Sequence, residues 1–241
     1  MSRSPGISIC LLCYNDATTI GPLVDSAAAA LDELGADGEI VVVDDGSTDD
    51  SAQRLSEAAR RQPRLRIVTH DENRGYGAAI RSALGAARGD WAFYTDGDGQ
   101  YRLDAVPDFA RRATDAVDVV QGYKRERADS LLRRVVGTAY QHFVRIAFGL
   151  RIRDPDCDFR LIRKRVSDQL ELTSSTGAIC VELVRRLQEE GARFVELPVD
   201  HYARSAGRSQ FFRPVRIARS LLDLTGLWIK LIARPALRRA G

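Results

Sequence analysis

The hydrophobic residues in the first hundred positions fall into short runs separated by longer amphipathic stretches. The short runs are rich in valine, isoleucine and leucine, and most end in glycine, acidic or amide residues, as buried strands do. In the stretches between them, apolar residues recur every three or four positions and predict helices. The predicted strands cover residues 7–13, 39–43, 65–69 and a run that begins at Trp91, and the predicted helices end near residues 36, 61 and 87.

The pattern becomes less regular in the second half of the chain. Strands are predicted over residues 117–122, 161–162 and 194–199, and helices over 131–148, 176–190 and 214–234. Strands that alternate with helices through short connections predict an α/β fold, with a Rossmann-like, mostly parallel central sheet and helices on both faces. We expect the main domain to cover residues 1–211 and an amphipathic, basic C-terminal helix to lie within 212–241.

The composition is that of a globular protein with a sizeable core, because 44% of the 241 residues are hydrophobic and 29% are charged. A net charge of +3 is too small to suggest general nucleic-acid binding. Cys10 and Cys13 lie within an apolar strand, where a thiol usually packs as a small hydrophobic group. No uninterrupted apolar stretch reaches the roughly 20 residues of a membrane span, and no signal peptide precedes the first strand. We therefore expect a cytoplasmic protein.

The strongest candidate for chemistry lies where the fourth strand ends, at Asp96 and Asp98. While the backbone stays extended, residues two apart project to the same side, and ligands of open α/β sheets bind beyond the carboxyl ends of the strands. Two carboxylates in such a place repel each other unless a cation lies between them. A hard divalent ion such as Mg²⁺ or Mn²⁺ suits these oxygen ligands and commonly brings substrate phosphates with it. The alternative is an acidic, glycine-rich loop that only turns the chain.

Two further strand ends carry polar residues. After the second strand, the run 44–47 places carboxylates beside Gly46, which allows a nucleobase or ribose to approach the backbone closely. An ordinary helix N-cap is the alternative interpretation of this run. After the third strand, Arg74 enters a glycine-rich turn and can reach a donor phosphate. That turn is too short and lacks the full glycine pattern of a dinucleotide-binding fingerprint.

Several motifs occur in an order that is more specific than any one of them. The first half contains Tyr14-Asn15-Asp16, Val43-Asp44-Asp45-Gly46-Ser47, Asn73-x-Gly75-x-Gly77 and Asp96-Gly97-Asp98-x-Gln100. The second half contains Gly122-Tyr123-Lys124, Arg127-Ala128-Asp129, Asp154-x-Asp156-Cys157-x-Phe159-Arg160 and Arg204-x-x-Gly207-x-Ser209. Over roughly residues 7–210 the chain resembles family-2 glycosyltransferases, which have a GT-A fold. Within that family it resembles the polyprenyl-phosphate glycosyltransferase branch, of which dolichyl-phosphate mannose synthase is the best-known member.

The resemblance implies a metal-dependent, inverting transfer of a sugar from a nucleotide-sugar to a polyprenyl phosphate, with Mg²⁺ or Mn²⁺ as cofactor. It places the nucleotide-sugar on Tyr14, Asn15, Asp16, Asp44, Asp45, Gly46, Ser47, Arg74 and Gly75. It places the catalytic metal and donor diphosphate on Asp96, Asp98 and Gln100, and the acceptor phosphate on Lys124, Arg127, Arg133, Arg204 and Arg208. The chain departs from the family pattern at Leu12, Asp16, Lys124, Asp158 and Gln210, where proline, glutamate, arginine, a small residue and lysine are usual.

Two other functions stay open at this point. An acceptor phosphate is ionised at neutral pH and needs no general base, whereas a sugar-hydroxyl acceptor requires one. Asp154 or Asp156 is the candidate base in that case, although each can equally cap a helix or pair with a nearby arginine. A non-catalytic nucleotide-binding regulator of a membrane complex is the third possibility, and the intact pair of Asp96 and Asp98 weighs against it.

The C-terminal helix bears on where the protein acts. Its apolar positions include Trp228, and arginines flank both of its ends. Such a helix suits the membrane surface, where a polyprenyl acceptor must be met. The prediction is therefore a peripheral association with the cytoplasmic face of a membrane. Packing on its own domain, or on a helix of a partner or a second copy, is the alternative.

Overall fold

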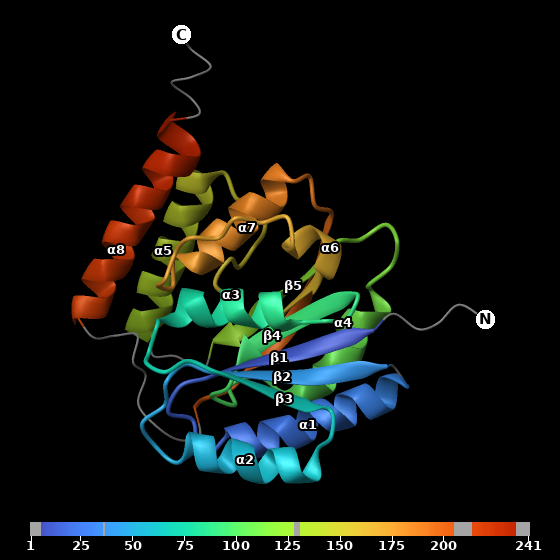
Figure 1. The fold of residues 1–241 in the computed structure, drawn as a ribbon. Helices are drawn as coiled ribbons and strands as arrows, with labels where there is room; N and C mark the ends of the chain where they lie inside the picture. Colours follow the sequence, from blue (N-terminus) through green and yellow to red (C-terminus); the bar gives the residue numbers. More distant parts are fainter. Residues whose placement is uncertain (1–5, 36, 128–130, 205–213, 235–241) are drawn as a thin grey trace.

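The computed structural model describes residues 6–35, 37–127, 131–204 and 214–234 (Figure 1). A seven-stranded sheet in the order β3-β2-β1-β4-β6-β5-β7 forms the centre of the molecule. β6 runs antiparallel to β4 and β5, and the other paired strands are parallel. The strands are β1 (Ile7–Cys13), β2 (Gly38–Asp44), β3 (Leu65–Thr69), β4 (Trp91–Asp96), β5 (Val119–Arg127), β6 (Arg160–Arg163) and β7 (Phe194–His201).

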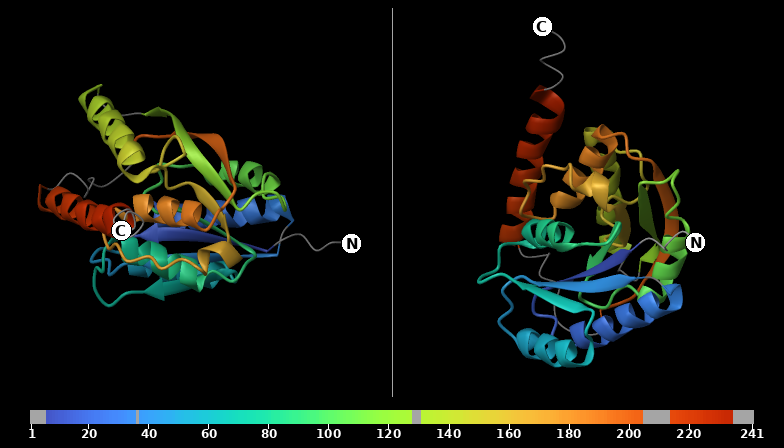
Figure 2. Two further views of the ribbon diagram at one scale, coloured as in Figure 1. Left: turned by 90° about the horizontal axis from the view of Figure 1, so that it is seen from above. Right: turned by 45° about the vertical axis from the view of Figure 1, so that its right-hand side comes forward.

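Helices cover both faces of this sheet (Figures 1 and 2). One face carries α1 (Ile20–Leu34), α2 (Ser51–Arg61) and α4 (Val106–Arg111), which follows the short 3₁₀ turn η1 (Leu103–Ala105). The opposite face carries α3 (Tyr76–Ala86) and α7 (Ile179–Glu189). The remaining helices are α5 (Leu131–Phe148), α6 (Lys164–Ser167), α8 (Pro214–Trp228) and its π-helical continuation η2 (Ile229–Ala233).

β1 shows why the sequence has a continuous apolar run rather than an alternating one. Ile9 and Leu11 pack into the core under α1, whereas Cys10 and Leu12 pack into the core under α3. Because successive side chains of a strand point to opposite faces, a strand covered on both sides needs apolar residues at every position. The parallel direction of the strands then brings the ends of β1, β2, β3, β4, β5 and β7 to one edge of the sheet. The residues that precede the antiparallel β6 reach the same edge.

Helix α8 packs on its own domain through one face. Leu224 and Leu227 are buried in a cluster with residues of α5 and α7, and the indole N–H of Trp228 donates to the carbonyl of Ala147 at 2.9 Å. On the outer faces of α8 and α5, Leu222 and Ile146 are 73% and 82% exposed. Contact with a membrane surface stays a prediction, and the domain boundary predicted after residue 211 falls outside the described residues. Among the helices that the structure describes, none is long and apolar enough to cross a membrane.

Candidate functional site

Asp96 is the last residue of β4, and Asp98 lies in the turn that follows. The backbone N–H of Gly97 between them donates to the carbonyl of Leu12 at 2.7 Å. A Cβ at residue 97 would lie 2.5 Å from that same oxygen, so only glycine fits between the ends of β4 and β1. The sheet therefore fixes the start of this acidic turn.

Three carboxylates influence one another at this corner. Burial raises the pKa of Asp96 well above its usual value, and the charges of Asp158 and Asp98 raise it further. The hydroxyl of Tyr76 opposes this effect by donating to Asp96 Oδ1 at 2.9 Å. Burial also raises the pKa of Asp158, whose Oδ1 accepts a weak hydrogen bond from the Cys180 thiol at 3.4 Å. Negative charge is thus unfavourable here without a positive partner.

The carboxylate of Asp98 already has a cationic partner. Arg204 Nη2 lies 2.6 Å from Asp98 Oδ2, and the backbone N–H of Gln100 donates to Asp98 Oδ1 at 3.0 Å. Gln100 holds the segment after β7 against this turn, because its Nε2 and its carbonyl oxygen bond to the backbone of Tyr202, both at 2.9 Å. The structure thus brings Arg204, which we assigned to the acceptor phosphate, to the carboxylates assigned to the metal.

The donor set suits a hard divalent cation that arrives with a diphosphate. Over the ranges that the structure describes, no three histidine, cysteine, aspartate or glutamate side chains converge into a preformed metal cage. Mg²⁺ is commonly bound by one or two carboxylates, with substrate phosphates and water as its other ligands. Asp96 and Asp98 can supply that pair. The Gln100 side chain faces the Tyr202 carbonyl instead, so its role as a ligand stays a prediction.

The loops after β1 and β2 are joined by Asn15. This residue has a left-handed backbone with φ of 58°, and its Oδ1 accepts from the backbone N–H groups of Thr48 and Asp49 at 2.7 and 3.3 Å. Its own N–H donates to Ser47 Oγ at 3.0 Å. The predicted nucleotide-binding residues of both loops therefore form one connected surface, with the half-buried Tyr14 beside it.

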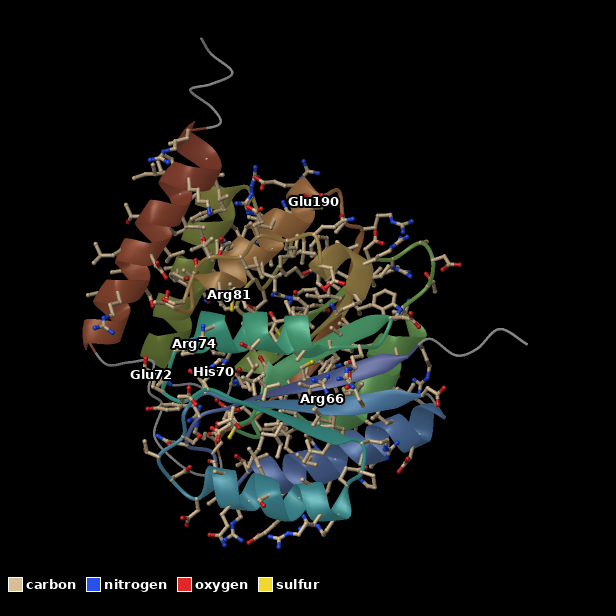
Figure 3. The ribbon with its side chains drawn as sticks, viewed as in Figure 1. Arg66, His70, Glu72, Arg74, Arg81 and Glu190 are labelled. Carbon is tan, nitrogen blue, oxygen red and sulfur yellow. The ribbon has the colours of Figure 1, made fainter. Side chains whose placement is uncertain are left out.

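Asp45 is a structural centre for the loop that carries Arg74. Its carboxylate accepts from His70 Nδ1 at 2.6 Å, from Asn73 Nδ2 at 3.0 Å, and from the backbone N–H groups of Arg74 and Gly75, both at 3.0 Å. Asp45 and Gly75, both predicted to bind the nucleotide-sugar directly, are thus bonded to each other. Their contribution to binding would be to place the exposed side chain of Arg74. Figure 3 shows His70 and Arg74 close together at this end of the sheet.

Asp44 and Gly46 shape the neighbouring turn. Asp44 is buried, and its Oδ1 accepts from the N–H of Ser47 at 3.0 Å, a bond within the turn that precedes α2. The helix-cap alternative has support at Asp49, whose Oδ1 accepts from the N–H of Ser51, the first residue of α2, at 2.9 Å. Gly46 has φ of +67°, and a Cβ there would lie 2.6 Å from the nitrogen of Asn73. Gly46 thus allows the loop after β2 to pack closely against the loop after β3, whether or not a ligand also approaches it.

Asp16 has a strongly perturbed environment. Burial raises its pKa to about 6, although the N–H of Tyr14 favours the charged form by donating to Oδ2 at 3.2 Å. The charge of Asp98 raises the pKa further, and that of Arg204 lowers it. Asp16, which stands where the family usually has glutamate, thus lies within electrostatic reach of Asp96 and Asp98. The sequence shows only that Asp16 follows Asn15. It does not show that Asp16 also lies near Asp98 and Arg204.

The predicted acceptor residues are only partly described. Lys124 Nζ donates to the carbonyl of Asp156 at 3.0 Å. Burial lowers the pKa of Lys124, but the charge of Asp154 and other acidic groups outweighs it, so the pKa lies above its usual value and the ammonium stays charged. The backbones of Arg127 and Arg133 lie in β5 and α5, and their side chains fall outside the described residues, as does all of Arg208.

Of the two candidate general bases, Asp154 has a carboxylate that is engaged by the protein itself, and Asp156 is bonded through its backbone. The buried carboxylate of Asp154 accepts from the Gln141 side chain and from the N–H of Lys124 at 3.4 Å. The carbonyl of Asp156 accepts from Lys124. Next to them, the fully buried Arg160 donates to the hydroxyl of Tyr94 at 2.8 Å. Hydrogen bonds of charged side chains therefore hold this loop in place just before β6.

The sequence analysis did not assign roles to three side chains that the structure places at the site. They are Tyr76, which bonds to Asp96, Asp158, which faces it, and Arg160, which braces the loop. Asp158 had a signal in the sequence, since it departs from the small residue usual in the family. Tyr76 stood inside the glycine-rich turn, but nothing in that turn indicates that its hydroxyl reaches the end of β4.

Comparison with known proteins decides the family. The sequence profile described as glycosyl transferase family 2 matches residues 8–171. The chain belongs to glycosyl transferase family 2. This confirms the family and the class of enzyme expected from the motifs.

The similar sequences of this family support the predicted branch. The chain is 30% identical over 207 residues to an undecaprenyl-phosphate 4-deoxy-4-formamido-L-arabinose transferase of Edwardsiella ictaluri, covering 85% of this chain and 62% of that one. It is 31% identical over 222 residues to the transferase of the same name from Pseudomonas fluorescens, covering 90% and 63%. The chain thus spans somewhat less than two thirds of the length of these relatives.

Solved structures confirm the GT-A-like fold. Glucosyl-3-phosphoglycerate synthase from Mycobacterium tuberculosis, in complex with Mg²⁺ and uridine diphosphate, superimposes with a TM-score of 0.68 at 19% identity, covering 94% of this chain and 79% of that one. Its complex with Mn²⁺, uridine-diphosphate-glucose and phosphoglyceric acid gives a TM-score of 0.69 at 20% identity and the same coverage. At this identity the likeness establishes the fold alone.

Proposed function

We propose that this family-2 chain transfers a sugar, with inversion, from a nucleotide-sugar to a polyprenyl phosphate, with Mg²⁺ or Mn²⁺ bound at Asp96 and Asp98. The names of the relatives support a lipid-phosphate acceptor, since they are transferases to undecaprenyl phosphate. The observation that carries the proposal is the pair of acidic side chains at the exit of β4. One has its pKa raised by burial and by neighbouring carboxylates, and the other is held by an arginine.

The cation would neutralise the charge that develops on the diphosphate leaving group. Asp96 and Asp98 would hold it, and Tyr76 would orient Asp96 through the 2.9 Å hydrogen bond. Asn15 and Asp44 would keep the loops after β1 and β2 in place for the nucleoside. Arg74 is exposed at the same edge and can reach the diphosphate. Each of these groups is fixed by backbone or side-chain bonds that exist without a ligand, as preorganised sites require.

The acceptor side is consistent with an attacking group that needs no base. A phosphate monoester is an anion at neutral pH, so transfer requires positioning rather than proton removal. Asp154 is bonded to Gln141 and to the backbone of Lys124, which is the arrangement of a loop brace. Lys124 keeps its charge beside this loop. We propose that the acceptor phosphate approaches the protein beside Lys124 and the loop that contains Asp154, at the cytoplasmic face of a membrane.

The test compares Asp96→Asn with Asp104→Asn, a matched change at an exposed residue on the following turn. Transfer to polyprenyl phosphate should fall about a hundredfold or more in the first variant and stay unchanged in the second.

A thermal-shift panel of nucleotide-sugars with and without Mn²⁺ would identify the donor, because a ligand that binds the folded state raises the melting temperature.

Two results would contradict the proposal. Full transfer by Asp96→Asn would exclude the metal role, and nucleotide binding without turnover of any sugar would indicate a regulator. Transfer to water-soluble hydroxyl acceptors, lost in Asp154→Asn or Asp156→Asn, would support the alternative acceptor class.

A further inference from the structure

Glu182 is a fully buried carboxylate on α7 that the proposed chemistry does not use. Its Oε2 accepts from the backbone N–H groups of Thr173 and Ser174 at 2.9 and 2.8 Å, and its Oε1 accepts from the Thr173 hydroxyl at 2.8 Å. Burying a charge is costly unless hydrogen bonds compensate it, and bonds to a charged acceptor are stronger than neutral ones. The carboxylate therefore fixes the backbone of residues 173–174 firmly.

The segment 173–175 presses on the N-terminus of α3. The carbonyl of Ser175 accepts from the N–H of Gly77 at 3.0 Å, and a Cβ at Gly75 would lie 2.5 Å from that carbonyl oxygen. A Cβ at Gly77 would overlap the carbonyl oxygen of Ser174. The same Ser174 oxygen also accepts from the guanidinium of Arg81, which is labelled on α3 in Figure 3. The two carbonyls thus define where the first turn of α3 lies.

Tyr76 stands between these two glycines, and its hydroxyl donates to Asp96 Oδ1 at 2.9 Å. Burial raises the pKa of Tyr76 well above its usual value, so the hydroxyl remains a donor at neutral pH. A continuous set of contacts therefore runs from Glu182 through residues 173–175 and the two glycines to Asp96. Each step is a hydrogen bond or a close backbone contact.

We propose that Glu182 is a positioning residue for the cation site, acting through residues 173–175 on Tyr76 and thereby on Asp96. The inference rests on the proposed function, since it assigns Asp96 to the cation. Partners beyond the direct ligands orient those ligands in metal sites, and their loss typically weakens the metal affinity or activity 10- to 100-fold. Glu182 itself lies on a helix that supplies no residue of the predicted site.

The experiment measures Mn²⁺ affinity by electron paramagnetic resonance of the free ion, together with the melting temperature, on the whole chain. Glu182→Ala should weaken Mn²⁺ binding about tenfold or more. Glu182→Gln should weaken it less, because an amide oxygen can still accept from the two backbone N–H groups. Glu189→Gln, on the same helix but away from the segment 173–175, should leave the affinity unchanged.

A second pair of variants tests the same contacts without removing a charge. Gly77→Ala places a methyl group against the Ser174 carbonyl, whereas Gly85→Ala, on the same helix, meets no atom within 4 Å. Alanine is a better helix former than glycine, so Gly85→Ala should keep or raise stability. Gly77→Ala should weaken Mn²⁺ binding as Glu182→Ala does.

The outcomes are distinguishable. If both Glu182→Ala and Gly77→Ala lower the melting temperature but keep the Mn²⁺ affinity within about twofold of the wild type, the positioning role is overturned and the proposed function stands. If the wild-type chain fails to bind Mn²⁺ even with a nucleoside diphosphate present, the metal-dependent function is overturned, and this inference with it.

Discussion

Arg204 Nη2 lies 2.6 Å from Asp98 Oδ2, although the two residues are 106 positions apart in the chain. The guanidinium occupies one of the two carboxylates that a divalent cation would need. A guanidinium and a divalent cation compete for the same negative charge, so we expect binding of the cation to free Arg204. Once freed, it is close enough to the site to meet the phosphates that arrive with the cation.

Arg204→Ala should therefore act in opposite directions on two measurements. In the absence of nucleotide, Mn²⁺ affinity should rise by about fivefold to tenfold, because a charge-assisted hydrogen bond of roughly 1–1.5 kcal/mol no longer competes. Sugar transfer should fall by at least a similar factor, because a phosphate-binding cation is lost. Titration of Mn²⁺ by calorimetry and a transfer assay give the two values.

Arg102→Ala is the matched control for this variant, since Arg102 is an exposed arginine near the same edge that pairs with Asp104. It should change neither measurement. Weaker Mn²⁺ binding by Arg204→Ala would contradict competition and would indicate that the arginine supports the cation site.

The carboxylate of Asp45 holds the loop of residues 70–75, and Asp45→Asn should loosen it. The amide nitrogen replaces one of the two carboxylate oxygens. It therefore faces either His70 Nδ1 and the Arg74 N–H, which bond to Oδ1, or the Gly75 N–H, which bonds to Oδ2. Leaving a buried donor unsatisfied costs about 1–3 kcal/mol, so the free energy of unfolding should fall by roughly 2 kcal/mol. Hydrogen exchange of the Arg74 and Gly75 amides should accelerate.

Asp71→Asn serves as the comparison, because Asp71 is exposed on the same loop. It should leave both the unfolding free energy and the exchange rates near those of the wild type. Equal exchange rates in the two variants would show that Asp45 does not anchor the loop.

The sequence predicted three elements with the bounds that the structure shows. The strand predicted over 7–13, in which six of the seven residues are apolar, is β1, and the third strand and the helix over 131–148 also have the predicted bounds. The sequence did not reveal α4 and α6, of six and four residues, because such short helices contain too few turns for a period. Nor did it show that β6 runs antiparallel, since four residues carry no directional signal.

For the site, local motifs identified the carboxylates but not their partners. Asp96 and Asp98 were predicted because they follow a strand directly. The contacts of Asp98 with Arg204 and of Asp96 with Tyr76 depend on how distant loops meet at the edge of the sheet. The same holds for Lys124, whose motif suggested a phosphate and whose ammonium bonds to the Asp156 carbonyl. Whether it also binds phosphate stays a prediction.

Acid should weaken the opposite edge of the sheet, where Asp118 is surrounded by arginines. Arg193 donates to its Oδ2 through Nε at 2.8 Å, and this bond, against the opposing effect of burial, lowers the pKa of Asp118 to about 2. The unfolded chain binds a proton more readily, so this stabilisation is complete above about pH 4 and disappears as the pH falls towards 2. Arg163 and Arg165 approach Asp118 Oδ1 at 3.5 Å.

Asp118→Asn should lower the free energy of unfolding at pH 7 by about 1–2 kcal/mol, a value reduced because solvent screens the partly exposed arginines. The difference from the wild type should vanish near pH 2. Asp168→Asn, which alters an exposed pair with Lys164, should have little effect. Urea unfolding between pH 2 and 7 measures both, and a difference that stays constant over this range would contradict the assignment.

Asp16 should give the opposite pH dependence. Burial raises its pKa to about 6 from a usual value near 3.8, so between these values the folded protein binds more protons than the unfolded chain. The free energy of unfolding contributed by Asp16 therefore falls as the pH rises from about 4 to 6, and the penalty is complete above that window.

Asp16→Asn removes the charge and keeps an acceptor for the Tyr14 N–H, so at pH 7 it should stabilise the chain by about 1–3 kcal/mol. The gain should shrink towards zero at pH 4, and Asp25→Asn, exposed on α1, should show no such trend. If Asp16 belongs to the donor site, the variant should be more stable and should bind the nucleotide more weakly. Greater stability without any loss of binding would place Asp16 outside the donor site.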